Sequence, residues 1–186
     1  MTTQCRLEPA AAQVPPRPIT YEEYCRACSG QRYLHRRWRY YHPAIEMACR
    51  LAPQRILEIG AAYLPLFNGS DTLDIGETYE PTYLHDAGAA PWPIKTNSYD
   101  LVIALQVWEH LRGRQREAFE ELRRCTRYAI LSLPYRWRHS NAWHNGIDDA
   151  RVREWSGGWP WTESITVPQL PIHRRRRKIY LFDFTG

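Results

Sequence analysis

The sequence predicts an α/β fold with a mostly parallel sheet and an antiparallel strand at its C-terminal end. From residue 55 onward, short apolar segments alternate with turns and one clear helical pattern. One of these segments, "LVIAL" at residues 101–105, is apolar throughout, which is typical of a parallel strand covered on both faces. Residues 163–184 instead contain two alternating segments in succession, which favours an antiparallel pair.

The length and composition indicate a single globular domain. The chain has 186 residues, of which 44% are hydrophobic. No apolar run approaches the length of a membrane helix, and the N-terminus lacks the basic start and apolar centre of a secretory signal. We therefore expect a soluble cytoplasmic protein with no membrane partner. The prolines near the N-terminus predict a flexible leader at 1–19, followed by one domain at 20–186.

Five cysteines, an odd number, fit a reducing compartment. Cys25 and Cys28 form a CxxC pair, and His42 and Cys49 could complete a zinc site. No second CxxC or paired-histidine motif accompanies them, so we expect no metal.

The N-terminal part of the domain, 20–52, is expected to be helical and to cover the substrate side. Thr20 and Glu23 have the spacing of a capping box, which predicts a short helix ending near Ser29–Gly30. A second helix is expected to have Pro43 in its first turn and to end before Pro53.

The first three strands are expected at Ile56–Ile59, Thr72–Ile75 and, more weakly, Tyr83–His85. A parallel crossover normally needs about a dozen residues or more. The first interval barely reaches this length and the second is shorter, so we expect shortened crossovers and a missing helix after strands one and two.

The strand at 101–105 is followed by a helical pattern at 113–127 and an apolar strand at 128–134, which together predict a right-handed βαβ unit. A short helix is expected within 147–157. The basic run "HRRRRK" at 173–178 is expected in a turn between the last two strands, where charge runs are usually solvated.

In open α/β sheets, ligands bind beyond the carboxyl ends of the strands. Polar or small residues follow four of the expected strands. Each of them alone has an ordinary explanation as a turn residue, a helix cap or a solvated charge. Their succession predicts a ligand site. The segments concerned are Glu58–Ala62, Asp74–Gly76, His85–Gly88 and Gln106–His110.

The stretch 55–134 resembles the class I, Rossmann-like, S-adenosylmethionine-dependent methyltransferases of the small-molecule type. "RILEIGAA" is similar to the first motif of that family, and "TLDI" is similar to the second. "HDAGAAPWPIKTNSYDLVIALQVWEHL" matches the acidic residue, the proline-rich loop, the strand and the "EHL" run that follow. "AFEELRRCTRYAILSLPY" extends the resemblance through the next helix and strand.

The resemblance implies S-adenosylmethionine as cofactor and S-adenosylhomocysteine as product. Gly60 would let the backbone approach the methionine moiety, and Glu58 would fix that loop or the cofactor ammonium. Asp74 would accept hydrogen bonds from the ribose hydroxyls, and Asp86 would accept one from the adenine amino group. The cofactor residues implied in this way are Glu58, Gly60, Ala61, Asp74, Ile75, Asp86, Ala87, Gln106 and Val107.

The first loop departs from the family pattern, because Ala61 and Ala62 stand near positions that usually hold glycine. Alanine resists a positive φ. We interpret the segment as an altered cofactor loop, in which either cofactor affinity is weakened or methyl transfer has been lost.

Methyl transfer from a sulfonium is an in-line displacement, in which positioning dominates and a general base is optional. The candidates for a base are His110, His144 and Tyr135, with His139 beside them. His110 could equally be a structural part of the "EHL" run.

The expected acceptor pocket combines the N-terminal helices with the loop "PYRWRHSNAWHNG". Its aromatic residues, interleaved with arginines, suit a planar or acidic small molecule. They are Trp38, Tyr40, Tyr41, Trp137 and Trp143. Two alternatives stay open: a nucleic-acid methyltransferase that uses the arginine-rich segments, and a catalytically inactive domain that binds a partner.

Overall fold

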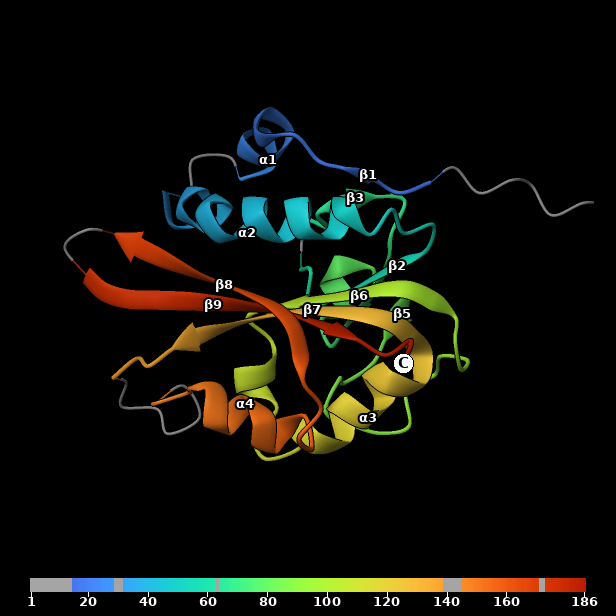
Figure 1. The fold of residues 1–186 in the computed structure, drawn as a ribbon. Helices are drawn as coiled ribbons and strands as arrows, with labels where there is room; N and C mark the ends of the chain where they lie inside the picture. Colours follow the sequence, from blue (N-terminus) through green and yellow to red (C-terminus); the bar gives the residue numbers. More distant parts are fainter. Residues whose placement is uncertain (1–14, 29–31, 63, 139–144, 171–172) are drawn as a thin grey trace, which may run out of the picture.

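A computed structural model describes residues 15–28, 32–62, 64–138, 145–170 and 173–186. Its elements form three layers, in which a seven-stranded sheet separates helices α1 and α2 from helices α3 and α4 (Figure 1). Two hydrophobic clusters fill the spaces on the two faces of the sheet. The predicted α/β class is confirmed.

The strand order of the large sheet is β5-β4-β2-β6-β7-β9-β8. Neighbours from β5 to β7 pair in parallel, whereas β9 is antiparallel to both β7 and β8, as the sequence predicted. The strands are β2 (Ile56–Ile59), β4 (Asp71–Asp74), β5 (Tyr83–Leu84), β6 (Tyr99–Leu105), β7 (Thr126–Tyr135), β8 (Trp161–Leu170) and β9 (His173–Asp183).

The described part of the chain begins at residue 15, within the stretch 1–19 for which the sequence predicted a flexible leader. Strand β1 (Arg17–Pro18) pairs antiparallel with β3 (Phe67–Asn68), and Ile19 is buried. Residues 1–14 lie outside the described part of the chain. Helix α1 (Tyr21–Ala27) then starts at the predicted capping box between Thr20 and Glu23.

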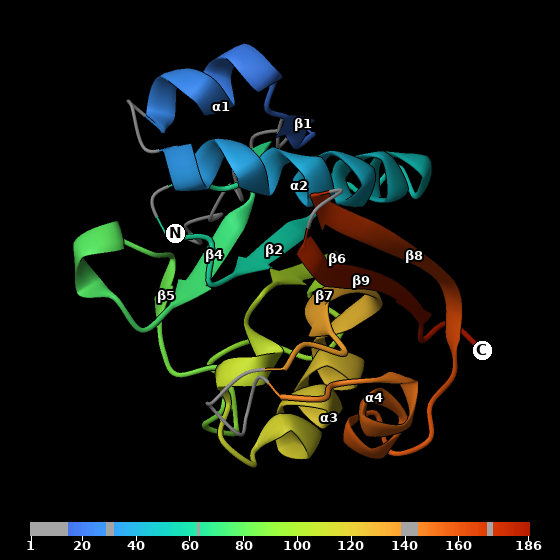
Figure 2. The same cartoon turned by 90° about the vertical axis from the view of Figure 1, so that its left-hand side faces the viewer.

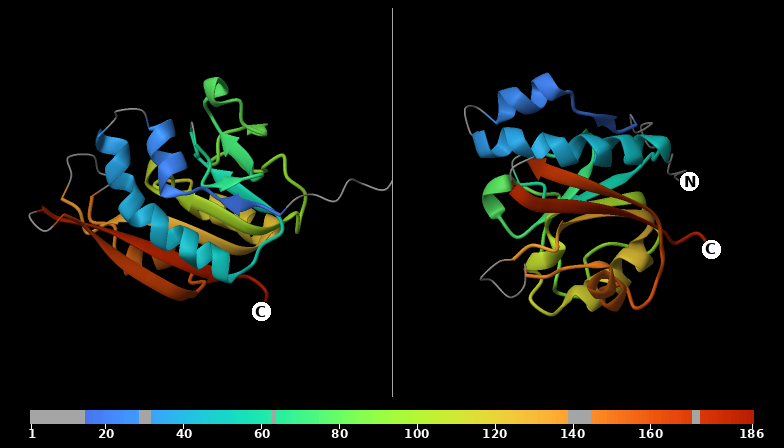
Figure 3. Two further views of the ribbon diagram at one scale, coloured as in Figure 1. Left: turned by 90° about the horizontal axis from the view of Figure 1, so that it is seen from above. Right: turned by 60° about the vertical axis from the view of Figure 1, so that its left-hand side comes forward.

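Helix α2 (Arg32–Arg50) contains Pro43 in its interior, so the prediction that this helix starts at Pro43 is wrong. Proline removes one helical hydrogen bond. The helix nevertheless continues because its apolar stripe, which includes Tyr40 and Met47, is buried against the sheet. Seen from above, α2 crosses β8 and β9 (Figure 3).

The shortened crossovers are confirmed. The short strand β3 stands between β2 and β4, and only a 3-10 turn, η1 (Glu77–Tyr79), lies between β4 and β5. In the described part of 60–98 there is therefore no α-helix, and this edge of the sheet projects away from α3 and α4 (Figure 2).

After β6, a second 3-10 turn, η2 (Trp108–His110), leads to α3 (Gln115–Cys125), and α4 (Asp149–Trp155) follows β7. The run at 173–178 lies in β9 rather than in a turn, because β9 keeps its pairing with β7 through Arg177 opposite Pro134. Arg177 is consequently only 4% exposed. No described helix is long and apolar enough to cross a membrane.

Candidate functional site

A cleft of about 610 Å³, counting the open space at its mouth, lies at the carboxyl ends of β2, β4 and β6. Four segments that are separate in the sequence meet there, which is where ligands bind in open α/β sheets. Its lining comprises Ile59, Gly60, Leu73, Asp74, Ile75, His85, Asp86, Ala87, Val107, His110 and Leu111. Six of the nine cofactor residues expected from the sequence are among them, together with His110.

Asp74 ends β4 and faces this cleft while it holds two loops in place. Its Oδ2 accepts a hydrogen bond from the Ala62 amide at 3.2 Å, and its Oδ1 accepts one from the Gly76 amide at 2.9 Å. Each carboxylate oxygen can accept a second hydrogen bond. The side chain can therefore fix the loops and still bind hydroxyl groups of a ligand.

Asp86 supplies a second carboxylate to the cleft. Its Oδ1 accepts from the Gly88 amide at 2.8 Å, and its Oδ2 accepts from the Arg114 guanidinium at 2.8 Å. Burial raises the pKa of Asp86, but these two donors outweigh burial and hold the pKa below its ordinary value. Asp86 is thus an ionised hydrogen-bond acceptor at neutral pH.

Gly60 sits where β2 ends, with φ of +66°, a conformation that favours glycine. A Cβ atom at this position would lie 2.6 Å from Val107 Cγ2. The close approach of the two segments therefore requires glycine. Gln106, by contrast, does not line the cleft, because its Nε2 donates to Ser132 Oγ on β7 at 3.0 Å.

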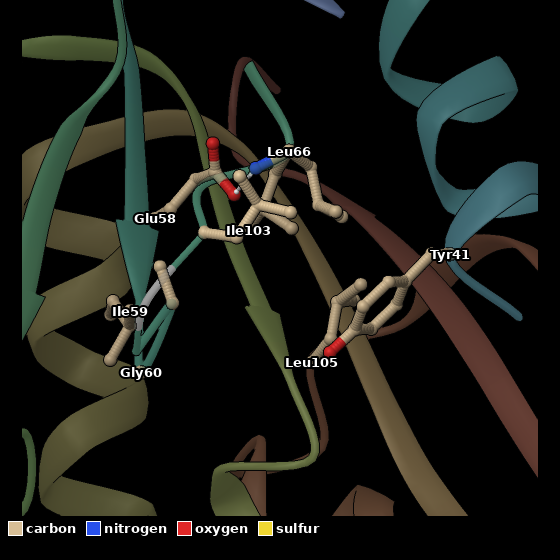
Figure 4. A pocket seen from close by; sticks show the side chains of 9 residues that line it. Tyr41, Glu58, Ile59, Gly60, Leu66, Ile103 and Leu105 are labelled. Carbon is tan, nitrogen blue, oxygen red and sulfur yellow. Dashed lines mark hydrogen bonds between the residues drawn. The ribbon is translucent and has the colours of Figure 1, made fainter. Parts of the chain in front are cut away.

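A smaller cavity of about 270 Å³ adjoins the cleft on the side of α2 (Figure 4). Ile59 and Gly60 border both hollows. Tyr41 reaches from α2 toward Leu105 at the end of β6. The lining comprises Tyr41, Glu58, Ile59, Gly60, Ala61, Leu64, Leu66, Ile103 and Leu105.

Glu58 borders this smaller cavity and holds the segment beneath the first loop. Its carboxylate accepts hydrogen bonds from the Leu66 amide at 2.7 Å, the Phe67 amide at 2.9 Å and Ser70 Oγ at 2.8 Å. Burial raises the pKa of Glu58 to about 7, although the three donors act in the opposite direction. This network ties the segment 66–70 to the end of β2.

Two of the three candidate bases, His110 and Tyr135, lie within the described residues, in different surroundings. His110 borders the cleft. Tyr135 donates to Asp149 Oδ2 at 3.3 Å, and Asp149 also accepts from Lys178 Nζ at 2.7 Å. This network ties the end of β7 to α4, and Tyr135 borders neither hollow. His144, like His139, lies outside the described residues.

A substitution at Ala62 tests whether the altered loop is strained, because Ala62 adopts a φ of +52° although it is not glycine. We expect Ala62→Gly to raise the free energy of unfolding by about 1 kcal/mol, since a left-handed conformation is costly for alanine. Denaturant unfolding measures this change. Ala61→Gly is the matched control: Ala61 has no positive φ, so extra backbone freedom should destabilise that variant. Equal losses in both variants would contradict strain at Ala62.

Neither a protein-family model nor a curated protein matches this sequence. Solved structures do match. A S-adenosylmethionine-dependent methyltransferase from Clostridium acetobutylicum aligns over 80% of this chain and 92% of its own, at 9% identity and a TM-score of 0.62. One from Leishmania major aligns over 88% of this chain and 80% of its own, at 13% identity and a TM-score of 0.62.

A third S-adenosylmethionine-dependent methyltransferase, from Aquifex aeolicus, aligns over 78% of this chain and 92% of its own, at 13% identity and a TM-score of 0.55. At these identities the likeness is one of fold. The chain has the Rossmann-like fold that these methyltransferases share, and the resemblance found in the sequence is confirmed at that level.

Proposed function

We propose that this chain, which has the fold of class I methyltransferases, binds S-adenosylmethionine and transfers its methyl group to a small molecule. The observation that carries the proposal is the cleft itself. It places two carboxylates, Asp74 and Asp86, around a largely apolar hollow beside a glycine that no other residue could replace without a clash.

The cleft suits the nucleoside half of the cofactor. Asp74 has the free lone pairs to accept hydrogen bonds from ribose hydroxyls, and Asp86 can accept one from an adenine amino group. Ile75 is 74% exposed at the mouth of the cleft, where a planar base would cover it. The side chains of Ala87 and Leu111 also contribute apolar surface to the lining of the cleft.

The smaller cavity suits the amino-acid half. Glu58 offers a carboxylate to the ammonium group. On the opposite wall, the hydroxyl of Tyr41 accepts a hydrogen bond from Arg37 Nη1 at 3.2 Å, which brings a cation near the cofactor carboxylate. Because Gly60 borders both hollows, a molecule that joins a nucleoside to an amino acid would pass along it. The cofactor, when bound, supplies an electrophilic methyl group on a sulfonium.

The residues of this chain then position the acceptor and shield it from water. His110, at the edge of the cleft, is our candidate for removing a proton from a hydroxyl or ammonium acceptor. The buried state of Arg177 and the contact of Lys178 with Asp149 favour a small-molecule acceptor over RNA. Neither side chain is therefore available to contact a phosphate backbone.

Titration calorimetry with S-adenosylhomocysteine tests the proposal. We expect binding in the micromolar range, since the cofactor would fill both hollows. Adenosine alone, which would fill only the cleft, should bind more weakly. Absence of heat at millimolar S-adenosylhomocysteine would contradict the proposal.

Methyl-labelled S-adenosylmethionine separates the alternatives. Label should enter an extract of small metabolites and stay out of total RNA. Label in RNA would favour the nucleic-acid methyltransferase, and cofactor binding without any transfer would favour the inactive binding domain.

A further inference from the structure

Three of the buried side chains that keep polar atoms without a hydrogen-bond partner among the described residues lie near the carboxyl ends of β6 and β7. They are Tyr40 with its hydroxyl, Glu109 with Oε2, and Arg177 with Nε and Nη1. Tyr40 and Glu109 are 2% exposed and Arg177 is 4% exposed. Buried polar groups in folded proteins nearly always have a partner, so unsatisfied ones need an explanation.

Arg177 lies over two aromatic rings, and two of its nitrogen atoms have no hydrogen-bond partner among the described residues. Its central carbon lies 4.5 Å from the centre of the Tyr40 ring and 4.8 Å from the Trp137 ring. Stacked rings keep a guanidinium rigid and poorly hydrated, while its N–H groups point outward in the plane. Such an arrangement is prepared for a planar acceptor of hydrogen bonds, such as a carboxylate.

Glu109 lies on η2, close enough to Arg177 and Arg37 for their charges to act on its carboxyl group. Burial raises the pKa of Glu109 to about 7, although its own amide and the nearby cations Arg177 and Arg37 act in the opposite direction. Glu109 and Arg177 influence each other electrostatically, yet the described structure contains no ion pair between them. Two opposite charges buried without contact are costly unless something polar connects them.

The sum of these charges restricts what can connect them. Arg177 provides one positive charge, and Glu109, with its pKa raised to about 7, provides less than one negative charge at neutral pH. A ligand with a single negative charge would complete the balance. A phosphate dianion would add a second negative charge beside Glu109 and is disfavoured.

The cluster lies at the same edge of the sheet as both hollows of the cofactor site. Tyr40 directly precedes Tyr41, which lines the smaller cavity, and Glu109 follows two residues after Val107, which lines the cleft. Arg177 pairs with Pro134 at the carboxyl end of β7. A molecule bound here would lie beside the cofactor.

We propose that Tyr40, Glu109 and Arg177 form the acceptor subsite, and that the methyl acceptor is a small carboxylic acid. Arg177 binds the carboxylate, with Tyr40 beside it, and Glu109 accepts a hydrogen bond from a hydroxyl or amino group on the same molecule. This assignment of substrate class rests on the proposed methyltransferase function.

Paired probes test the subsite without knowledge of the natural acceptor. We would use glycine, 4-hydroxybenzoate and indole-3-acetate, each beside its neutral primary amide, in ligand-observed NMR with and without S-adenosylhomocysteine. At least one acid should bind the wild-type protein about tenfold or more tightly than its amide, as expected for hydrogen bonds to a charged partner. This comparison needs no variant. Equal binding of acids and amides in all three pairs would overturn the proposal.

Arg177→Gln and Arg176→Gln form a matched pair of variants, because neighbouring strand residues point to opposite faces and Arg176 is exposed. The preference for the acid should disappear in the first variant and persist in the second. Glu109→Gln should retain the preference, since it removes a negative charge near the bound carboxylate. Equal effects of the two arginine variants would exclude Arg177 as the anchor.

Calorimetry with S-adenosylhomocysteine on the same samples distinguishes this proposal from the proposed function. Normal cofactor binding without any preference for acids would contradict the proposed acceptor subsite but would still support the proposed cofactor site. Arg177-dependent binding of an acid without cofactor binding would contradict the proposed methyltransferase function but would still support an acid-binding site.

Discussion

Replacement of Asp74 by alanine is expected to lower the affinity for S-adenosylhomocysteine by at least about 100-fold. The carboxylate would hold both ribose hydroxyls, and a hydrogen bond to a charged group contributes about 1.5–3 kcal/mol. The same change leaves the amides of Ala62 and Gly76 without their hydrogen-bond acceptor, so the two loops that carry them are held less firmly beside the cleft. Titration calorimetry measures the affinity, and a thermal melt without ligand checks that the domain is folded.

Asp74→Asn and Glu77→Ala complete this experiment. Asparagine keeps one acceptor oxygen and should leave an intermediate affinity. Glu77 lies nearby on η1, is exposed and does not line the cleft, so its replacement should leave binding unchanged. An Asp74→Ala protein that is folded and binds the nucleoside normally would show that Asp74 only holds the loops.

The part of the site that local sequence predicts is the part made by strand ends. Asp74 ends β4 and Asp86 follows β5 by two residues, so their meeting follows from the parallel order of the sheet, and the structure places both in one cleft. Gly60 was predicted in the same way. Its close contact with Val107 depends on the packing of neighbouring segments and could not be derived from the sequence.

The burial of Arg177 could not be predicted from composition. The run at 173–178 is basic throughout, and such a run is usually solvated. Arg177 is buried by the register of β9 against β7 and by α2. This helix begins at Arg32, well before Pro43, and so brings Tyr40 over the strand. Register and helix length both depend on contacts between residues far apart in the chain, so the link between Glu109 and Arg177 became evident only in three dimensions.

Gly60→Ala is expected to cost about 2–5 kcal/mol of unfolding free energy and to weaken cofactor binding. The left-handed backbone costs alanine about 1–2 kcal/mol, and the new Cβ at 2.6 Å from Val107 Cγ2 adds an overpacking cost of about 1–3 kcal/mol. Gly146→Ala is the matched control. Gly146 has φ of +68°, and a Cβ there would meet no atom of the described residues within 4 Å, so only the backbone cost should appear.

The double variant Gly60→Ala/Val107→Ala separates the two consequences of the Gly60 contact. Removal of the Val107 methyl groups should recover the overpacking part of the loss, which appears as a favourable coupling in a double-mutant cycle measured by denaturant unfolding. Because the Cβ at position 60 would still stand where the cleft and the smaller cavity meet, cofactor affinity should stay low even when stability returns. If the loss for Gly60→Ala equals that for Gly146→Ala, the contact with Val107 is not what requires glycine. If affinity recovers together with stability, Gly60 supports the cleft without approaching the cofactor.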